Sequence, residues 1–437
     1  MTTRSQTTTR MMAKVPDLQH KLGCLSKEDA WLLFKKLAFA QGREWGDISE
    51  LEPIGREIVE KCKGLPLRNS CGACYFEGYP MTKGELLWVA NGFIPAKGGN
   101  NLYMLGEEIF NCLVWRSFFS VKANSRDDEY VMHDLIHDMA RLVMGDDCLV
   151  IESGKEVIIP NGVLHLSSSC PDFHFSPQDL GKLTSLRSVF MFGWMYKCNI
   201  SQIFNHVQLR VLYLRGVDLN TLPESVCKLK HLRYLNLSDS SIEVLRESII
   251  YLQNLQMLFL KDCGRLKQFP KGLRYMRNLQ RLDTIGCDFL RHLPRGIKEL
   301  SSLRTLSFFT LTNPFLNESV AKIGELGTLN LLEGELYING LENVRGLNEA
   351  KSANLKCKTN LSVLALNWSE KAFSNAFSIR KEQMFTHDEE VLEGLEPTSS
   401  LKKLSIWDYM GKIISPSVRN VSIFQHLGDY PILGSLN

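Results

Sequence analysis

Two histidines four residues apart are the clearest candidates for metal chemistry in this chain. His133 and His137, in the segment His-Asp-Leu-Ile-His, would share one face of a helix, and the segment differs by one residue type from the HExxH pattern of zinc proteases. Those enzymes need the glutamate of the motif as a general base and a third zinc ligand further along the chain. Here Asp134 replaces the glutamate, and Glu156 is the best third ligand available. A metalloprotease therefore stays an alternative, and we predict neither a metal site nor a catalytic residue.

The cysteines indicate no stronger reactive site. Cys71 and Cys74 form a lone CxxC without a partner pair, so a zinc site there would lack half its ligands. Cys263 and Cys287 are predicted to be buried thiols that bond the backbone of a turn, with a disulfide between them as the alternative. Twelve cysteines at irregular spacing in 437 residues are typical of reduced thiols in an intracellular protein. No GxSxG nucleophile motif occurs, and we predict that the chain is not an enzyme.

A leucine pattern recurs from residue 209 onward and predicts the elements of the larger part of the chain. Successive LxxLxL segments are 23, 23, 24 and 24 residues apart, and they start at Leu209, Leu232, Leu255, Leu279 and Leu303. A period of 20–29 residues is the mark of leucine-rich repeats. Each repeat supplies one short strand whose alternate leucines point into a shared core. Because a single repeat cannot bury that face, the repeats must stack into a curved solenoid.

The repeat pattern continues less regularly on both sides. An entry repeat is expected at Leu183, and later strands at Leu336, Leu361 and Leu401. The segment 370–390 between them is predicted to be an exposed insertion. The last residues carry no polar cap, so we expect the solenoid to continue beyond this sequence.

The strand residues between the leucines are predicted to face the concave side of the solenoid. Aromatic, Met, Arg and Lys side chains on an open sheet are the types that protein interfaces favour, although β-propensity alone also enriches aromatics there. The predicted partner-binding residues are Tyr213, Arg215, Tyr234, Met257, Phe259, Lys261 and Arg281.

The charge balance and hydropathy narrow the class of partner. With 51 basic and 48 acidic residues the formal charge is +3, which does not call for nucleic acid or an anionic membrane. No apolar run approaches the roughly 18 residues of a spanning helix, so no transmembrane segment is expected. The polar, Ser/Thr/Arg-rich first residues do not form a secretory signal, and an organelle transit peptide is the alternative to a cytoplasmic location.

The first 150 residues are predicted to be mainly helical. Amphipathic patterns indicate helices at 25–41, 51–63, 83–92 and 105–116. From Tyr130 a short strand is expected to run directly into a further amphipathic helix.

Three short motifs in this region resemble those of a known family. Thr2-Thr3-Arg4, Gly64-Leu65-Pro66-Leu67 and Met132-His133-Asp134 occur in this order and are followed by leucine-rich repeats. This arrangement resembles the plant intracellular disease-resistance proteins, the nucleotide-binding (NB-ARC), leucine-rich-repeat receptors, most closely their coiled-coil branch. The resemblance covers nearly the whole chain.

The resemblance implies an ADP/ATP switch and assigns three site residues. In the family the proline of GLPL packs by the adenine, which corresponds to Pro66. The histidine of MHD reaches the ADP β-phosphate, which corresponds to His133, and the arginine of TTR senses the terminal phosphate, which corresponds to Arg4.

The sequence also departs from the family pattern. It contains no GxxxxGK[ST] phosphate loop and no paired acidic residues for Mg²⁺. The helices expected after Leu67 are absent as well. We therefore expect that this chain does not hydrolyse ATP and does not bind ADP stably, and that it begins inside the nucleotide-binding domain.

These observations predict an α/β chain with a mostly helical NB-ARC remnant, a winged-helix-like part and a leucine-rich-repeat solenoid. The predicted boundaries are 1–24 (nucleotide-binding remnant), 25–70 (partial helical subdomain), 71–150 (winged-helix-like part with MHD) and 151–437 (solenoid). The resemblance implies a cytoplasmic innate-immunity receptor whose repeats bind a pathogen effector, a guarded host protein or another receptor. Two alternatives are a natively longer ADP/ATP-switch resistance protein and the product of a decaying gene.

Overall fold

The computed structural model describes twelve parts of the chain, namely residues 84–94, 102–116, 118–121, 130–132, 134–151, 158–168, 181–192, 201–312, 319–368, 383–411, 423–427 and 430–432. Several predicted features lie outside these parts, namely Arg4, Pro66, His133, Glu156, Cys71, Cys74 and the helices expected at 25–41 and 51–63. The chain divides into two compact units, and helix α6 (Asp134–Met144) is the described part of the first. All other described elements belong to the second unit.

The second unit begins with a small helical segment. Helices α4 (Gly84–Asn91) and α5 (Leu102–Trp115) are followed by an antiparallel pair, β1 (Phe119–Val121) and β2 (Tyr130–Met132). Aromatic rings form its core, because Phe110 lies 5.7 Å from Trp88 and 5.2 Å from Phe119, measured between ring centroids. These elements confirm the helices expected near 83–92 and 105–116 and the strand expected at Tyr130.

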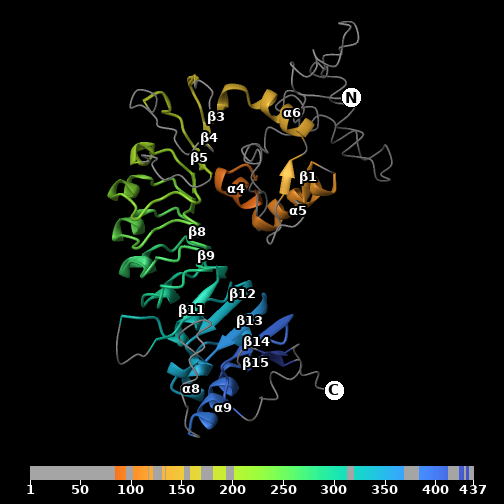
Figure 1. Ribbon diagram of the computed structural model, residues 1–437, viewed down its shortest axis with the longest axis vertical. Coiled ribbons are helices and arrows are strands. Elements are labelled where there is room, and N and C mark those ends of the chain that lie inside the picture. Colours follow the sequence, from red (N-terminus) through yellow and green to blue (C-terminus); the bar gives the residue numbers. More distant parts are fainter. Residues whose placement is uncertain are drawn as a thin grey trace. The chain divides into compact units, whose positions relative to one another are not determined.

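A parallel sheet of eight strands follows and forms the first part of the solenoid (Figure 1). Its strands are β3 (Cys148–Ile151), β4 (His165–Ser168), β5 (Ser188–Met191), β6 (Val211–Leu214), β7 (Tyr234–Asn236), β8 (Met257–Phe259), β9 (Arg281–Asp283) and β10 (Thr305–Leu306). The five regular repeats and the entry repeat at Leu183 are therefore confirmed as strands. The sheet starts earlier than the sequence pattern indicated, since β3 precedes the expected boundary at residue 151 and β4 lies in a stretch without an LxxLxL signal.

Four successive repeats, those of β6 to β9, turn after the strand through the same backbone conformation. The turn residues Gly216, Asp239, Asp262 and Gly286 have φ angles of 75°, 58°, 59° and 75°, in the left-handed region. At Gly286 a Cβ atom would collide with the Asp262 carboxylate of the preceding repeat. Glycine is therefore required at this position for space as well as for its backbone angle.

Short 3₁₀ helices form the convex side of the first sheet. They are η6 (Glu224–Lys228), η7 (Glu247–Tyr251), η8 (Lys271–Tyr275) and η9 (Ile297–Glu299). The Glu247 carboxylate accepts hydrogen bonds from the backbone amides of Lys271 (2.7 Å) and Gly272 (3.2 Å). One repeat thus caps the 3₁₀ helix of the next, which couples neighbours along the stack.

The thiols of Cys263 and Cys287 donate hydrogen bonds to backbone carbonyls of the preceding repeats. Cys263 Sγ lies 3.1 Å from the oxygen of Leu237, and Cys287 Sγ lies 3.1 Å from that of Leu260. Both are free thiols that bond the backbone, as predicted, and the disulfide alternative is not realised. Cys263 is buried, whereas Cys287 is partly exposed and the prediction of its burial is only partly met. Burial raises the pKa of each thiol, which keeps both protonated.

A second sheet begins at Phe308, where the chain leaves the first one. It consists of β11 (Phe308–Thr310), β12 (Gly334–Asn339), β13 (Leu361–Asn367), β14 (Lys403–Trp407), β15 (Ile423–Leu427) and β16 (Tyr430–Ile432). All neighbours are parallel except β15 and β16. The strands expected at Leu336, Leu361 and Leu401 are confirmed as β12, β13 and β14.

The predicted exposed insertion 370–390 is wrong in its C-terminal part. Helix α9 (Gln383–Leu395) includes residues 383–390, and it packs against α8 (Leu347–Lys351) beside the second sheet (Figure 1). Val391, Leu392 and Leu395 are buried in the common core, and Asp388 is only 3% exposed. The apolar residues that anchor this helix come near its end, where the sequence interpretation had already resumed the solenoid.

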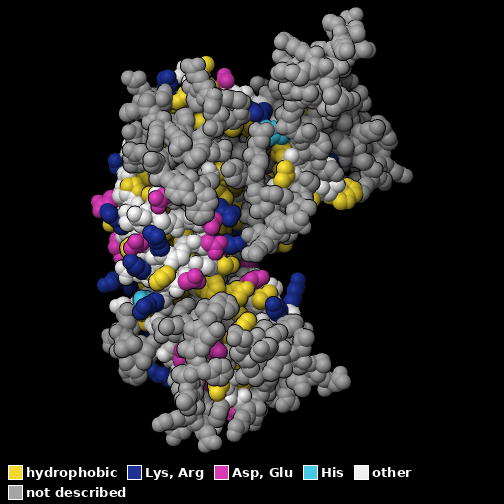
Figure 2. Space-filling view, viewed as in Figure 1, with side chains coloured by type: hydrophobic (Ala, Val, Ile, Leu, Met, Phe, Trp, Pro, Cys, Tyr) yellow, Lys and Arg dark blue, Asp and Glu magenta, His cyan; other side chains and the backbone are white. Residues whose placement is uncertain are grey.

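On the face drawn in Figure 2, lysine and arginine side chains are interspersed with acidic ones over the repeats. This agrees with the nearly balanced charge of the sequence. In the part of the chain that the structure describes, no helix is both long enough and apolar enough to cross a bilayer.

Candidate protein-binding face

Two rows of side chains cross the concave face of the first sheet in register. The first, named here the Tyr234 row, is Cys148, His165, Ser188, Val211, Tyr234, Met257, Arg281 and Thr305. The second, named the Phe259 row, lies two residues further along each strand and is Val150, Ser167, Phe190, Tyr213, Asn236, Phe259 and Asp283. Side chains two residues apart point to the same side of a strand, so both rows lie opposite the leucine core.

The end of helix α4 is bonded to the Tyr234 row and the neighbouring arginines. Ser188 Oγ donates to Asn91 Oδ1 at 2.7 Å, and Asn91 Nδ2 donates to the Leu87 carbonyl at 3.1 Å. The Arg210 guanidinium donates to the Asn91 carbonyl at 2.8 Å. A cation at the C-terminal end of a helix complements the partial negative charge of the helix dipole. The contact therefore combines buried hydrogen bonds with favourable electrostatics.

Helix α5 contacts the same row further along the sheet. The Tyr103 hydroxyl donates to Gln256 Oε1 at 3.4 Å, and the Arg281 guanidinium lies 5.3 Å from the centroid of the Tyr103 ring. Burial raises the pKa of Tyr103 to about 12, although Arg281 and other arginines act in the opposite direction. The hydroxyl is therefore neutral and stays a hydrogen-bond donor at physiological pH.

His165 belongs to the same covered row. Its ring lies 6.0 Å from that of Phe93, and the side chain is 5% exposed. Burial, helped by Arg187 and Arg210, lowers its pKa to about 4. This histidine thus stays neutral across the physiological range.

Two of the predicted partner-binding residues are not on an open surface. Tyr234 is 5% exposed and Met257 is fully buried, whereas the sequence pattern predicted both to be accessible. The prediction of accessibility is wrong for them. Residues of α4 and α5 contact Ser188 and Arg281 of the same row, and Phe259 packs against Tyr234. Asn91, Tyr103, Ser188, Arg210 and Gln256 make these contacts, and no repeat-based sequence signal identifies them.

The remaining five predicted residues keep some exposure. Arg215 pairs with Asp239 through a 2.6 Å contact, and Phe259 stacks obliquely on Tyr234 at 5.1 Å. Tyr213 lies 5.1 Å from the Phe192 ring. Lys261 is partly exposed beside them. An aromatic surface next to charged groups that are held in place is what a protein interface needs.

Arg281 is held more firmly than its neighbours. It donates to Thr305 Oγ1 at 2.9 Å and pairs with Glu333 at 3.2 Å, and its side chain is 15% exposed. Arg304 shares the same carboxylate at 3.6 Å. Arg281 therefore stabilises the concave face through these contacts, and only a small part of its side chain is available to a partner.

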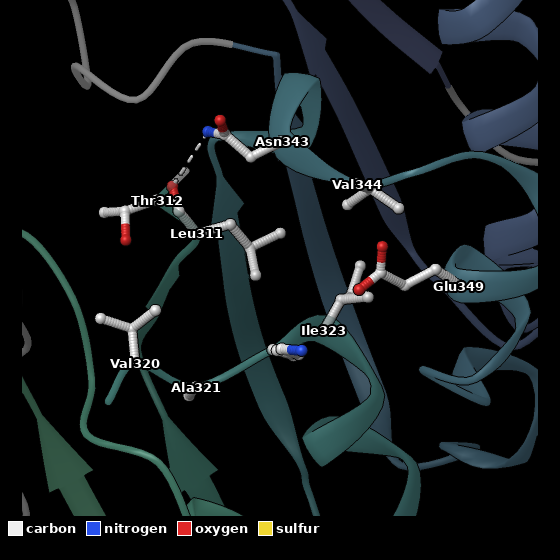
Figure 3. Close-up of a pocket in the computed structure, with 9 residues that line it drawn as sticks. Leu311, Thr312, Val320, Ala321, Ile323, Asn343, Val344 and Glu349 are labelled. Atoms are coloured by element: carbon white, nitrogen blue, oxygen red, sulfur yellow. Dashed lines mark hydrogen bonds between the residues drawn. The ribbon is translucent and has the colours of Figure 1, made fainter. Parts of the chain in front are cut away.

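The predicted nucleotide residues cannot be placed, because Arg4, Pro66 and His133 lie outside the described ranges. Among the described residues no group of three His, Cys, Asp or Glu side chains is arranged to hold a metal ion. One small pocket lies near the start of the second sheet, lined among others by Leu311, Val320, Asn343 and Glu349 (Figure 3). Its volume of about 10 Å³ has room for about one water molecule and not for a nucleotide.

Comparison with protein families agrees with the two kinds of structure seen here. Residues 75–140 match the family model described as Disease resistance protein Winged helix domain. Residues 207–264 match Leucine rich repeat, and residues 323–432 match R13L1/DRL21 LRRs. The segment α4–β2 is thus part of a winged-helix domain, and both sheets belong to leucine-rich repeats.

Curated relatives match almost the entire chain. It is 31% identical over 475 residues to the disease resistance protein RGA1 of Solanum bulbocastanum, covering 96% of this chain and 44% of the relative. It is 32% identical over 491 residues to RGA2 of the same species, covering 95% and 47%. The chain therefore spans less than half the length of these relatives.

Among solved structures, an internalin (InlF) of Listeria monocytogenes matches with a TM-score of 0.36 and 16% identity, covering 70% of this chain and 92% of that one. A likeness at this level adds no argument about function. The family models and the relatives together establish that this chain belongs to the disease resistance proteins of plants, of which it contains winged-helix and leucine-rich-repeat parts.

Proposed function

We propose that this chain acts in plant innate immunity as the sensing part of a receptor that is not an enzyme, and that its leucine-rich repeats bind a protein partner in the cytoplasm. The partner would be a pathogen effector, a guarded host protein or another receptor. The observation that carries the proposal is the partly exposed cluster of Tyr213, Arg215, Phe259 and Lys261 on a face whose neighbouring row is already occupied. The similarity to disease resistance proteins over nearly the whole chain supports it.

The assignment of individual residues is part of the same proposal. Tyr213, Arg215, Phe259, Lys261 and Arg281 would contact the partner first. Tyr234 and Met257 would take part only where α4 and α5 leave the sheet.

A leaf assay tests the proposed function. The full chain and the triple variant Arg215→Ala, Phe259→Ala, Lys261→Ala are expressed in leaves that are then challenged with a bacterial pathogen. We expect the chain to change bacterial growth and ion leakage several-fold, and the triple variant to lose this effect because it lacks the central side chains of the interface.

The matched control is the double variant Tyr251→Ala, Tyr275→Ala, which removes two exposed aromatic side chains from the convex side. It should behave like the unchanged chain at equal protein level. Equal responses with the unchanged chain and the triple variant would refute the proposed binding face.

A second candidate is a natively longer protein with an ADP/ATP switch in which Arg4, Pro66 and His133 take their family roles. The observation in its favour is that the chain covers only 44–47% of RGA1 and RGA2. An immunoblot of the endogenous protein with an antibody to the solenoid tests it. A band about twice the size of this chain supports the switch, and a band of this chain's own size contradicts it.

A further inference from the structure

A row of long polar side chains lies just before the strands of the first sheet. In the row, each backbone amide donates to the carbonyl of the preceding member at 2.7–2.9 Å, and the members are Arg187, Arg210, Arg233, Gln256, Gln280 and Arg304. They hold equivalent places in successive repeats, so their side chains leave the backbone in similar directions. The first three are all arginines, and we name them the Arg210 triad. Because neighbouring strands are about 4.8 Å apart, the triad starts from backbone positions within about 10 Å.

The triad is accessible, and two of its guanidinium groups converge. Arg187 is exposed, and Arg210 and Arg233 are partly exposed. A Cβ atom at Gly92, the exposed residue after α4, would lie 3.6 Å from Arg210 Nη1 and 3.8 Å from Arg233 Nη1. Arg210 also donates to the Asn91 carbonyl at 2.8 Å. The end of α4 therefore holds one arginine of the triad in place beside a second.

The triad lacks the negative charge that balances the other end of the same row. Arg304 pairs with Glu333 at 3.6 Å. By contrast, within the described ranges no carboxylate forms an ion pair with Arg187, Arg210 or Arg233. Burial and the charges of Arg187 and Arg233 lower the pKa of Arg210, which shows that the three charges oppose one another. Like charges held side by side are unfavourable, and a bound anion would relieve this repulsion.

The spacing of the triad indicates which kind of anion fits. A guanidinium group binds a carboxylate through two parallel hydrogen bonds, so three arginines can take three carboxylates. On an α-helix, side chains three or four residues apart have Cβ atoms about 5–6 Å apart, close to the spacing of neighbouring strands. A helix that lies across the strands with glutamates at every fourth residue can therefore offer one carboxylate to each arginine.

We infer that the Arg210 triad binds an acidic helix of the protein partner. This rests on the proposed function and adds to it the chemistry of one segment of the partner. The Phe259 row lies three residues further along each strand, at about 10 Å, so one protein is large enough to contact both. Contacts between opposite charges at the rim of an interface mainly speed association and select the partner, and they weaken as the salt concentration rises.

An acidic peptide tests the triad directly. The probe is a fluorescein-labelled, alanine-based helical peptide with glutamate at every fourth position, and its binding to the full chain is measured by fluorescence anisotropy at low ionic strength. The double variant Arg187→Gln, Arg233→Gln should bind about tenfold more weakly, because two charge pairs are lost. Arg210 is kept, since it also holds the end of α4. Arg304→Gln is the matched control from the same row and should bind normally.

A second variant protects the test against misfolding of the first. Arg187→Glu changes a single exposed side chain and should also weaken binding, whereas a peptide with glutamine in place of glutamate should not bind the unchanged chain. Absence of binding by the unchanged chain, or an equal loss in Arg304→Gln, would overturn the inference. Tighter binding of inorganic tripolyphosphate than of the acidic peptide would also overturn it, since the triad would then be a site for a small phosphate ligand.

The leaf assay separates the proposed function from the role of the triad. If the chain alters defence, the double variant does so equally and the peptide does not bind, the role of the triad is refuted and the proposed function stands. If the chain has no effect on defence while the peptide binds as expected, the proposed function fails and the triad remains a site for acidic helices.

Discussion

The two sheets of the solenoid differ in the length of their strands and in the elements that connect them. In the first, strands of two to four residues alternate with short 3₁₀ helices, and repeats are 23 or 24 residues long. In the second, β12 and β13 have six and seven residues, and the α-helices α8 and α9 lie beside the strands. Longer repeats supply more chain per strand, which allows an α-helix where a short repeat has room for one turn.

The concave faces differ as well. On the first sheet, residues of α4 and α5 contact Ser188 and Arg281 of the Tyr234 row. On the second sheet Tyr337 and Trp407 flank small residues and remain partly exposed. The concave face of the regular repeats is thus partly occupied by another part of the same chain.

The largest loss of stability is expected when a core leucine of either sheet is replaced. Leu258→Ala in β8 and Leu364→Ala in β13 each remove a buried side chain and should cost about 3 kcal/mol of the free energy of unfolding. Amide hydrogen exchange should accelerate around the altered strand, because each repeat mainly contacts its neighbours. If either variant accelerated exchange equally in both sheets, the two would form one cooperative unit and the contrast drawn here would be wrong.

The second largest effect is expected from weakening the contact between α4 and the first sheet. Ser188→Ala leaves the buried Asn91 Oδ1 without its 2.7 Å donor, which should cost about 1–3 kcal/mol. Exchange of the α4 amides should become faster while β12 to β14 stay unchanged. Ser241→Ala, at a more exposed hydrogen bond with Asp218, is the control. An unchanged α4 would mean that this hydrogen bond does not hold the helix on the sheet.

A buried lysine gives the second sheet region a pH dependence. Lys358 Nζ donates to the Leu329 carbonyl at 3.1 Å, and burial lowers the pKa of Lys358 from 10.5 to about 8. Between these values the unfolded chain binds more protons than the folded one, so the free energy of unfolding should rise from pH 8 to pH 10.5. The rise should be on the order of 1–3 kcal/mol, since a difference of one pKa unit corresponds to about 1.4 kcal/mol.

The variant Lys358→Met should lack this dependence. Chemical denaturation at a series of pH values measures it, with Lys356→Met as the matched control at a neighbouring exposed lysine. A rise of the same size in the Lys358→Met variant would assign the pH dependence to another group.

The smallest effect is expected on the convex side of the first sheet. Arg246 and Glu224 form an exposed ion pair at 3.3 Å. Arg246→Ala should change the free energy of unfolding by less than about 0.5 kcal/mol. A change comparable to that of Ser188→Ala would show that the convex surface stabilises the stack more than its exposure suggests.

Local patterns in the sequence were sufficient to predict most of the strands of the solenoid. The leucines at fixed spacing predicted β6 to β10 and the entry strand β5, since each inward side chain follows from the alternation along a strand. The buried position of the Cys263 thiol was predicted from the place of this residue in the leucine-rich repeat. Helix α9 was missed because the apolar residues that anchor it come late in a polar stretch. Arg4, Pro66 and His133 remain predictions based on family motifs.

By itself, then, the sequence determined the repeat architecture, the buried leucines and the family, because these depend on the type and spacing of neighbouring residues. The tertiary structure decided which parts of the concave face are accessible. Ser188 meets Asn91 across 97 residues of chain, and Gln256 meets Tyr103 across 153. No local pattern encodes such a contact, since it depends on where a separate domain packs. Tyr234 and Met257, in the row that α4 and α5 contact, are buried, whereas Phe259 is partly exposed.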